Sequence, residues 1–160
     1  MVTRIRMQSS GYQDIAEGRN IKESSFGAMT YGDRLSGVNA HSIGASAEMA
    51  VAIYLGTEVD REITPRGDDG IDLQVDGLSV GVKASTYMSN PFLRVEVEHF
   101  SEHVDRYVLC AVDINDHSTV EIIGWASSSD VVTAPTRKFL DRGPLNYVLS
   151  ESELRDMSTW

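Results

Sequence analysis

The amino-acid sequence predicts an α+β fold with a mixed, mostly antiparallel sheet flanked by helices. One segment, residues 41–55, places apolar side chains at helical spacing, whereas most segments after it alternate apolar and polar residues as half-buried strands do. These strand-like segments follow one another with short turn-like connections. Such an order is typical of an antiparallel meander rather than of repeated strand–helix units.

Composition narrows the class of protein. The chain has 160 residues, of which 41% are hydrophobic and 24% charged, as expected of one globular domain. Its single cysteine, Cys110, lies in an apolar run and cannot form an internal disulfide. No apolar run is long enough to cross a bilayer, and the N-terminus lacks the apolar block of a secretory signal. We therefore expect a cytoplasmic protein that does not bind a membrane.

The net charge of −10 argues against a large nonspecific nucleic-acid surface. Residues 41–160 carry nine basic and twenty acidic side chains, so a polyanion could bind only at local basic patches. The candidates for nucleic-acid contacts are Arg4, Arg6, Arg94, Arg137 and Lys138, with Arg142 close to the last two.

Residues 1–40 are rich in glycine and serine. We expect them to form an N-terminal arm or extension that orders against a partner, which includes the possibility of a homodimer. Residues 41–160 would then form the folded domain.

The clearest helix is predicted over residues 41–55, with Ser42 as its N-cap and Gly56 at its end. Glu48 lies at the edge of the apolar stripe, among small residues. Its carboxylate either points along a seam between the helix and a sheet or lies in solvent, and periodicity leaves both open. The stripe consists of Ile43, Ala47, Ala50, Val51 and Tyr54.

The strongest short-range signal is a hairpin over residues 70–85. Apolar and polar residues alternate on both sides of an Asp-Gly pair at 76–77, which tolerates the positive φ of a primed two-residue turn. The polar face then brings Asp72 opposite Gly81, with Lys83 a diagonal step of about 7–8 Å away. Taken alone, this is an ordinary hairpin with a solvated polar face. The apolar face consists of Ile71, Leu73, Val75, Leu78, Val80 and Val82.

The other elements are shorter. Further strands are predicted at 59–64, 92–97, 107–112 and 119–125. We also predict a turn at 65–69 and a helical turn at 101–106. A short helix capped by serines is predicted after 127–129, and a C-terminal helix at 151–157.

The order of the charged residues resembles that of the PD-(D/E)xK nuclease superfamily. A glutamate on a helix comes first, then an aspartate at the start of a hairpin, then a lysine that ends the second strand of the hairpin. The chain resembles small, often phage- or prokaryote-encoded members of this superfamily over about residues 41–130. The matching segments are Ile43-Gly44-x-x-Ala47-Glu48-x-Ala50-Val51-x-x-Tyr54-Leu55-Gly56, Asp69-Gly70-Ile71-Asp72 and Val80-Gly81-Val82-Lys83-Ala84-Ser85, with 107–109 and 120–126 as later strands. The resemblance implies a restriction-endonuclease-like core.

The resemblance also implies an active site. Asp72, Glu48 and the main-chain carbonyl of Val82 would hold Mg²⁺, for which Mn²⁺ can substitute, and Lys83 would orient the attacking water. Asp72, Lys83 and Glu48 are thus the expected catalytic residues. The family's second acid, two residues before the lysine, is Gly81 here, and Glu48 is its first substitute. Weaker substitutes are Asp68, Asp69 and Glu96.

The function implied is metal-dependent hydrolysis of phosphodiester bonds, with DNA as the expected partner. The alternative is a catalytically inactive nuclease-fold protein that binds nucleic acid or a protein, such as a phage counter-defence factor. Gly81 and the acidic net charge favour this alternative. A third interpretation is an unrelated α+β protein in which Asp72 and Lys83 form a surface ion pair.

Overall fold

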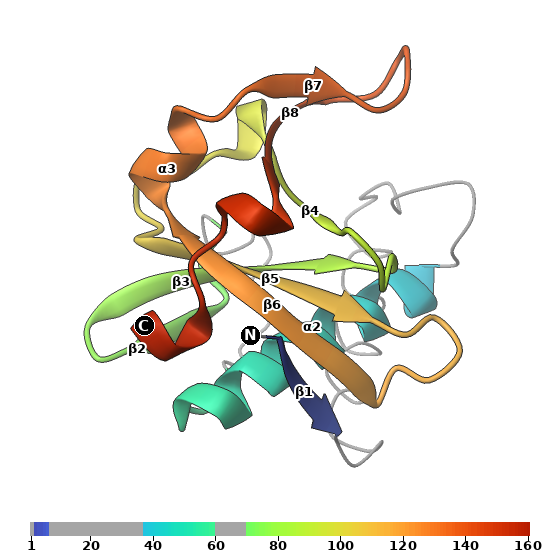
Figure 1. Cartoon of the computed structure of the whole chain (residues 1–160), viewed down its shortest axis with the longest axis vertical. Helices are drawn as coiled ribbons and strands as arrows, with labels where there is room; N and C mark the ends of the chain where they lie inside the picture. Colours follow the sequence, from blue (N-terminus) through green and yellow to red (C-terminus); the bar gives the residue numbers. More distant parts are fainter. Residues whose placement is uncertain (1, 7–36, 60–69) are drawn as a thin grey trace.

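The computed structural model describes residues 2–6, 37–59 and 70–160, and it has an α+β fold (Figure 1). A five-stranded mixed sheet has the strand order β1-β6-β5-β3-β2, and a three-stranded antiparallel sheet has the order β4-β8-β7. The strands are β1 (Thr3–Arg6), β2 (Leu73–Val75), β3 (Leu78–Ser85), β4 (Phe92–Glu96), β5 (Arg106–Val112), β6 (Thr119–Ser127), β7 (Thr136–Lys138) and β8 (Leu145–Ser150). The helices are α2 (Gly37–Leu55) and α3 (Ser128–Val132), with 3-10 turns at Val97–His99, Glu151–Glu153 and Met157–Thr159.

The predicted α+β class is confirmed, but the strands do not form a simple meander. β3 and β5 are neighbours and run parallel, from Val80 opposite Arg106 to Ser85 opposite Ala111. Parallel neighbours require a crossover connection of a dozen residues or more. The segment between β3 and β5 provides this crossover, and its strand β4 pairs with β8 in the second sheet instead of extending the hairpin.

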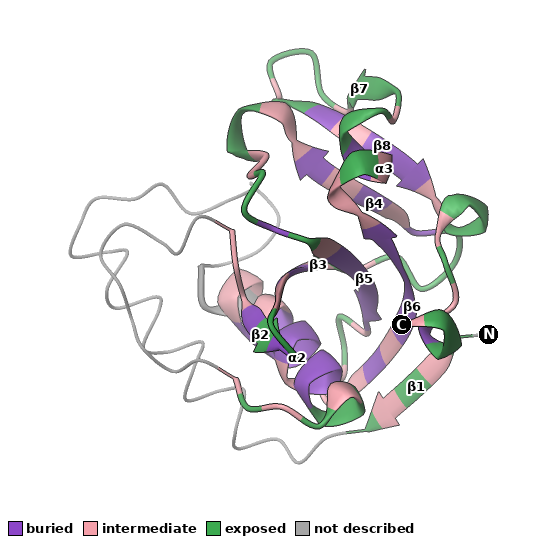
Figure 2. Cartoon of the chain, turned by 90° about the vertical axis from the view of Figure 1, so that its left-hand side faces the viewer, coloured by how far each residue is buried: buried purple, intermediate pink, exposed green. Residues whose placement is uncertain are grey.

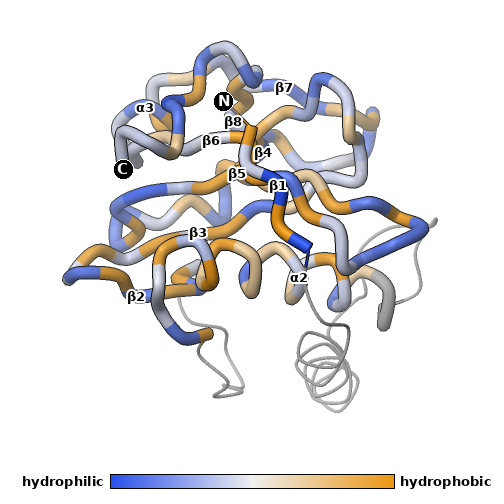
Figure 3. Tube along the Cα trace, turned by 60° about the horizontal axis from the view of Figure 1, so that its bottom comes forward, coloured by the Kyte–Doolittle hydropathy of each residue, from blue (hydrophilic) through white to orange (hydrophobic). Residues whose placement is uncertain are grey.

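The five-stranded sheet is buried on both faces, so the molecule has two apolar clusters. The first lies between this sheet and α2, and the second lies between this sheet and the three-stranded sheet (Figure 2). Figure 3 shows the hydrophobic stretches of α2 and the central strands facing each other. Residues of β5 alternate between the clusters, as expected of a central strand. Val108, Cys110 and Val112 belong to the first cluster, and Tyr107, Leu109 and Ala111 to the second.

Helix α2 is longer and more deeply buried than its sequence pattern predicts. It begins at Gly37, so Ser42 lies inside the helix and is not its N-cap; its hydroxyl is hydrogen-bonded to Nδ1 of His117 at 2.8 Å. Ile43, Ala47, Ala50 and Val51 are buried as predicted, but Tyr54 is 36% exposed, and the prediction for it is wrong. No helix in the described part of the chain is long and apolar enough to cross a membrane.

The hairpin prediction is confirmed at its turn and wrong at its far end. Asp76 and Gly77 both have positive φ (50° and 80°), and Val75 and Leu73 pair with Leu78 and Val80 in the expected register. Ile71, however, packs against the second cluster and not on the face shared by the other apolar residues of the hairpin. The regular ladder ends at Leu73, so the alternation of faces does not extend to Ile71.

Several short elements differ from the predictions. The sequence predicts no strand before the first helix, yet β1 pairs antiparallel with β6. Two 3-10 turns, at Glu151–Glu153 and Met157–Thr159, take the place of the expected C-terminal helix, and a single turn closed by the hydrogen bond from the Val104 N–H to the Ser101 carbonyl lies within 101–106. Ser127 caps α3 as predicted, within a capping box shared with Asp130. The rest of the predicted N-terminal arm, most of the strand at 59–64 and the turn at 65–69 lie outside the described residues.

Candidate active site at the edge of β3

The site starts with Asp72, just before β2. Its Oδ2 accepts a hydrogen bond from the main-chain N–H of Val82 at 2.7 Å, and its own N–H donates to the carbonyl of Val80 at 2.8 Å. The carboxylate therefore takes the place that a main-chain carbonyl would have if β2 continued. In consequence, the last paired residue of β3 on this side is Val80, and the strand continues without β2 from there to Ser85.

The main chain of Val82 offers a second oxygen at the same place. In a strand, the N–H and C=O of one residue point to the same side. Since the N–H of Val82 points to Asp72, its carbonyl faces the same edge of the sheet. A carboxylate and a main-chain carbonyl are the oxygen donors that Mg²⁺ and Mn²⁺ bind. The donor chemistry at this edge therefore fits a hard divalent cation.

Gly81 and Lys83 are on the face of β3 that looks toward the second cluster, because their neighbours Val80 and Val82 belong to the first cluster. Lys83 is only partly buried, as its long stem and charged end require. On the same face, a Cβ placed on Gly81 would lie 3.1 Å from the ring of Tyr107 and 3.1 Å from the carbonyl oxygen of Gly70.

This crowding explains why position 81 is a glycine. The nearest described groups around Gly81 are the Tyr107 ring and the Gly70 carbonyl, and the parallel register places Tyr107 directly beside Gly81. The space beside Gly81 is thus occupied by the Tyr107 ring. A side chain at position 81 would need the ring or the backbone to move.

Glu48 approaches from the other side of the sheet. It lies on α2, which packs on the face that carries Val80 and Val82, and it is only 4% exposed. Of the two orientations that periodicity leaves open, the buried one is therefore correct. A buried carboxylate is stable only where other groups pair with it or donate hydrogen bonds to it. Glu48 and Asp72 both have interaction partners.

The structure brings together some of the predicted site residues more closely than others. Asp72 and Val82 are in direct contact, and Lys83 follows Val82 in the chain. Glu48 and Lys83 start from opposite faces of the five-stranded sheet and can meet only around the edge of β3. In the described part of the chain, no three His, Cys, Asp or Glu side chains form a metal-binding group.

Of the weaker substitutes for the second acid, Glu96 alone lies within the described residues. Glu96 is at the end of β4 in the second sheet, where its carboxylate pairs with Nδ1 of His99 at 2.9 Å. Asp68 and Asp69 lie outside the described residues. Among the predicted acids that the structure describes, Asp72 and Glu48 thus remain.

Tyr107 is a site residue that the sequence argument missed. Burial, foremost, raises the pKa of its hydroxyl above 10.0, and the negative charge of Asp72 raises the pKa further, while a hydrogen bond with Ser101 opposes both. Tyr107 reads as the first residue of a buried strand, and only the parallel register of β3 and β5 places it beside Gly81. No local pattern in the sequence carries that information.

The five predicted basic residues form two separate groups. Arg4 and Arg6 are on β1, and Figures 1 and 2 draw β1 and β7 toward opposite ends of the molecule. Arg4 donates from Nε to Oε1 of Glu121, its neighbour across the strands, at 3.0 Å. Arg94, Arg137 and Lys138 belong to the three-stranded sheet.

No protein-family model matches the chain, and no curated protein or solved structure is significantly similar to it.

Proposed function

We propose that this chain is a metal-dependent nuclease of the PD-(D/E)xK type that hydrolyses phosphodiester bonds of DNA. The observation that carries the proposal is the hydrogen bond from Val82 to Asp72 at the edge of β3, with Lys83 as the next residue. It supports the order of acid, carbonyl and lysine on which the family's chemistry depends. A mixed sheet with α2 on one face is compatible with a restriction-endonuclease-like core.

Each residue has a distinct role in this proposal. Asp72 and the Val82 carbonyl would hold the divalent cation, and Glu48 would complete or brace its ligand shell from α2. The bound cation would polarise the scissile phosphate and lower the pKa of a bound water. The Lys83 ammonium would orient the attacking water and offset the negative charge that develops on the phosphate.

A matched pair of substitutions in one hairpin tests the proposal. Asp72→Asn and Asp76→Asn remove the same charge by the same change, and Asp76 is an exposed turn residue whose positive φ asparagine tolerates. We expect Asp72→Asn and Lys83→Met to abolish cleavage of plasmid and single-stranded DNA with Mg²⁺ or Mn²⁺, and Asp76→Asn to leave it intact. Cleavage that survives both Asp72→Asn and Lys83→Met would rule out this site.

The second candidate function is that of an inactive nuclease-fold binding protein, and the crowding at Gly81 favours it. With the Tyr107 ring beside position 81, a cation would have fewer carboxylate ligands than in the family. Fewer negatively charged ligands lower the affinity of the site for the cation. Calorimetry with Mn²⁺ on the wild-type protein and on Asp72→Asn separates the two functions. Absence of Mn²⁺ binding together with absence of cleavage would favour the binding protein.

A further inference from the structure

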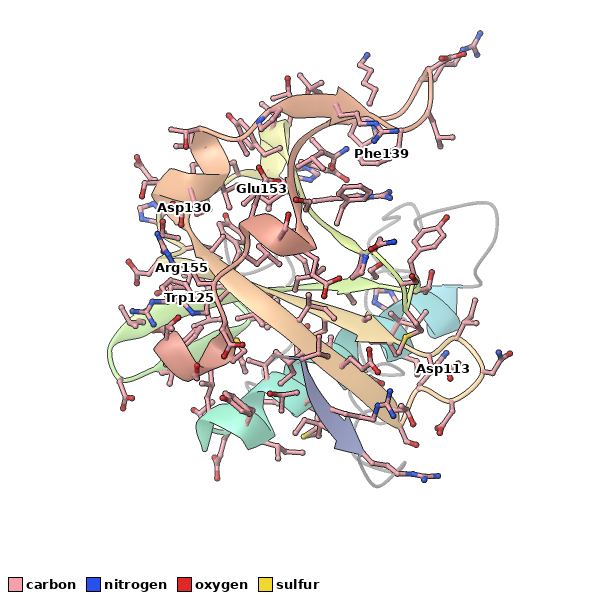
Figure 4. All side chains as sticks on the ribbon, viewed as in Figure 1. Asp113, Trp125, Asp130, Phe139, Glu153 and Arg155 are labelled. Atoms are coloured by element: carbon pink, nitrogen blue, oxygen red, sulfur yellow. The ribbon has the colours of Figure 1, made fainter. Side chains whose placement is uncertain are left out.

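The outer face of the three-stranded sheet carries two arginines that share one aromatic ring. The guanidinium carbon of Arg94, on β4, lies 3.5 Å from the centroid of the Phe139 ring, and that of Arg137, on β7, lies 4.7 Å from it. Arg94 pairs with Val148 and Arg137 with Asn146, two positions apart on β8, so both arginines are on the same face. Figure 4 shows Phe139 just below β7.

This face is turned away from the apolar core. The alternating residues of the same strands, Leu93, Val95, Leu149 and Tyr147, pack in or against the second cluster. A guanidinium stacked on a ring keeps its N–H groups at its rim, in the plane in which arginine binds phosphate oxygens in pairs. The Phe139 ring therefore fixes the planes of two arginines before any ligand arrives, which reduces the entropy lost on binding.

The β7–β8 hairpin adds further positive charge next to this ring. Lys138 and Arg142 are exposed, and Leu140, between them, is 74% exposed. The acidic groups nearby are Asp141, in the hairpin loop, and Glu96, which pairs with Asn146 on the same face as Arg94 and Arg137 and contacts Nδ1 of His99. In a chain with a net charge of −10, this is a local excess of positive charge on one projecting element (Figure 1).

We infer that the outer face of the three-stranded sheet, with the β7–β8 hairpin, is a binding surface for the phosphate backbone of duplex DNA, and that Phe139 is a positioning residue for Arg94 and Arg137. Arg142, in the hairpin loop, extends the surface, whereas Lys138 pairs with Leu145 and starts on the opposite face of β7. The inference rests on the proposed function for its choice of DNA, but it concerns binding and not cleavage.

Binding of a fluorescent 20-bp DNA duplex, measured by anisotropy in EDTA over a series of salt concentrations, tests the surface without any catalytic step. Arg137→Ala with Arg142→Ala removes two exposed charges, and Arg4→Ala with Arg6→Ala removes two at the other end of the molecule. We expect the first pair to weaken binding about tenfold at low salt and to lower the salt slope by about 2. The second pair should change neither.

Phe139 requires its own variants. Phe139→Ala should weaken binding several-fold although it removes no charge, and Phe139→Tyr, which keeps the ring, should bind like the wild-type protein. A circular-dichroism melt of each variant identifies any loss of fold. Equal affinity in Phe139→Ala and Phe139→Tyr would overturn the positioning role.

Two outcomes would overturn the surface itself: no binding by the wild-type protein at low salt, or an equal loss from both charge pairs. The inference and the proposed function fail separately. If Asp72→Asn does not change cleavage but Arg137→Ala with Arg142→Ala weakens binding, the active-site proposal fails and the surface stands. If cleavage depends on Asp72 but the two double variants bind DNA alike, the binding surface fails and the active-site proposal stands.

Discussion

The carboxylate of Asp72 caps the main-chain N–H of Val82 at 2.7 Å, and this contact ends the pairing of β2 with β3. One side chain thereby serves two purposes. It satisfies a main-chain donor that would otherwise be unpaired at the end of the ladder, and it places a carboxylate beside the edge on which the proposed chemistry depends.

The first prediction separates these two purposes. Asp72→Ala leaves the partly buried N–H of Val82 without this acceptor and should lower the free energy of unfolding by about 1–3 kcal/mol. Asp72→Asn retains an oxygen that can accept the hydrogen bond and should cost less, although it removes the charge. Urea denaturation of both variants measures the difference, and equal destabilisation by the two would show that the cap contributes little.

The second prediction concerns the space beside Gly81. A methyl group there meets the Tyr107 ring and the Gly70 carbonyl at 3.1 Å, so Gly81→Ala should destabilise the fold by about 1–3 kcal/mol. Gly44 offers the matched control, because no described atom lies within 4 Å of its would-be Cβ and it lies inside α2. Gly44→Ala should instead stabilise by about 0.5–1 kcal/mol through helix propensity. Thermal melts of both variants should therefore shift in opposite directions.

The third prediction concerns Gly124 on β6. Its Cβ would lie 2.6 Å from the carbonyl oxygen of Arg155, whose backbone pairs with that of Trp125 through hydrogen bonds of 3.0 and 2.8 Å. Gly124→Ala should push this segment away and disturb the edge-to-face contact of Trp125 with Trp160.

Tryptophan fluorescence measures this effect directly. The chain has two tryptophans, and both belong to this contact, so the emission spectrum reports on it alone. We expect a red shift in Gly124→Ala at temperatures where the protein remains folded. A spectrum identical to that of the wild-type protein would show that the segment accommodates the methyl group.

The fourth prediction is a pH dependence at Asp130. Burial raises the pKa of its carboxyl, but hydrogen bonds from the Ser127 hydroxyl and N–H and the charge of Arg155 outweigh burial, so the pKa lies below 3.8. The unfolded chain therefore binds the proton more tightly than the folded chain. The stabilisation is complete above pH 3.8 and is lost as the pH falls through the lower pKa of the folded state.

Asp130→Asn removes this linkage. The difference in unfolding free energy between the wild-type protein and Asp130→Asn should be constant near neutral pH and shrink as the pH falls below 3.8. Asp141→Asn, in the exposed β7–β8 loop, provides the control for loss of one negative charge. A difference that grows on acidification would contradict the assignment.

The parts of the fold that follow from local chemistry are the parts that the sequence predicts well. The turn at Asp76 and Gly77 sets its own register, and the cap at Ser127 depends on residues within one helical turn. β4 is recognisable as a strand, but nothing local to it says that it pairs with β8. Long-range pairing is decided by which apolar faces cover each other in the whole chain.

The same distinction applies to the candidate site. The pairing of Leu73 with Val80 follows from the turn, whereas Asp72 lies beyond the last paired residue and contacts the Val82 N–H through its carboxylate. The position of the Tyr107 ring beside Gly81 does not follow from the turn, because it depends on the parallel neighbour β5, which comes from a distant part of the chain. The side from which Glu48 arrives depends in the same way on which face of the sheet α2 covers.

The burial of β5 on both faces restricts the register in which it can pair with β3. Because its odd-numbered and even-numbered residues serve different layers, a slip of one residue against β3 would exchange both sets at once. The bulky ring of Tyr107 would then enter the layer under α2, and the smaller side chains of Val108 and Cys110 would leave voids in the second cluster. Misregistered pairings are thus penalised on two sides of the same strand, and this one strand keeps the alignment of both halves of the molecule.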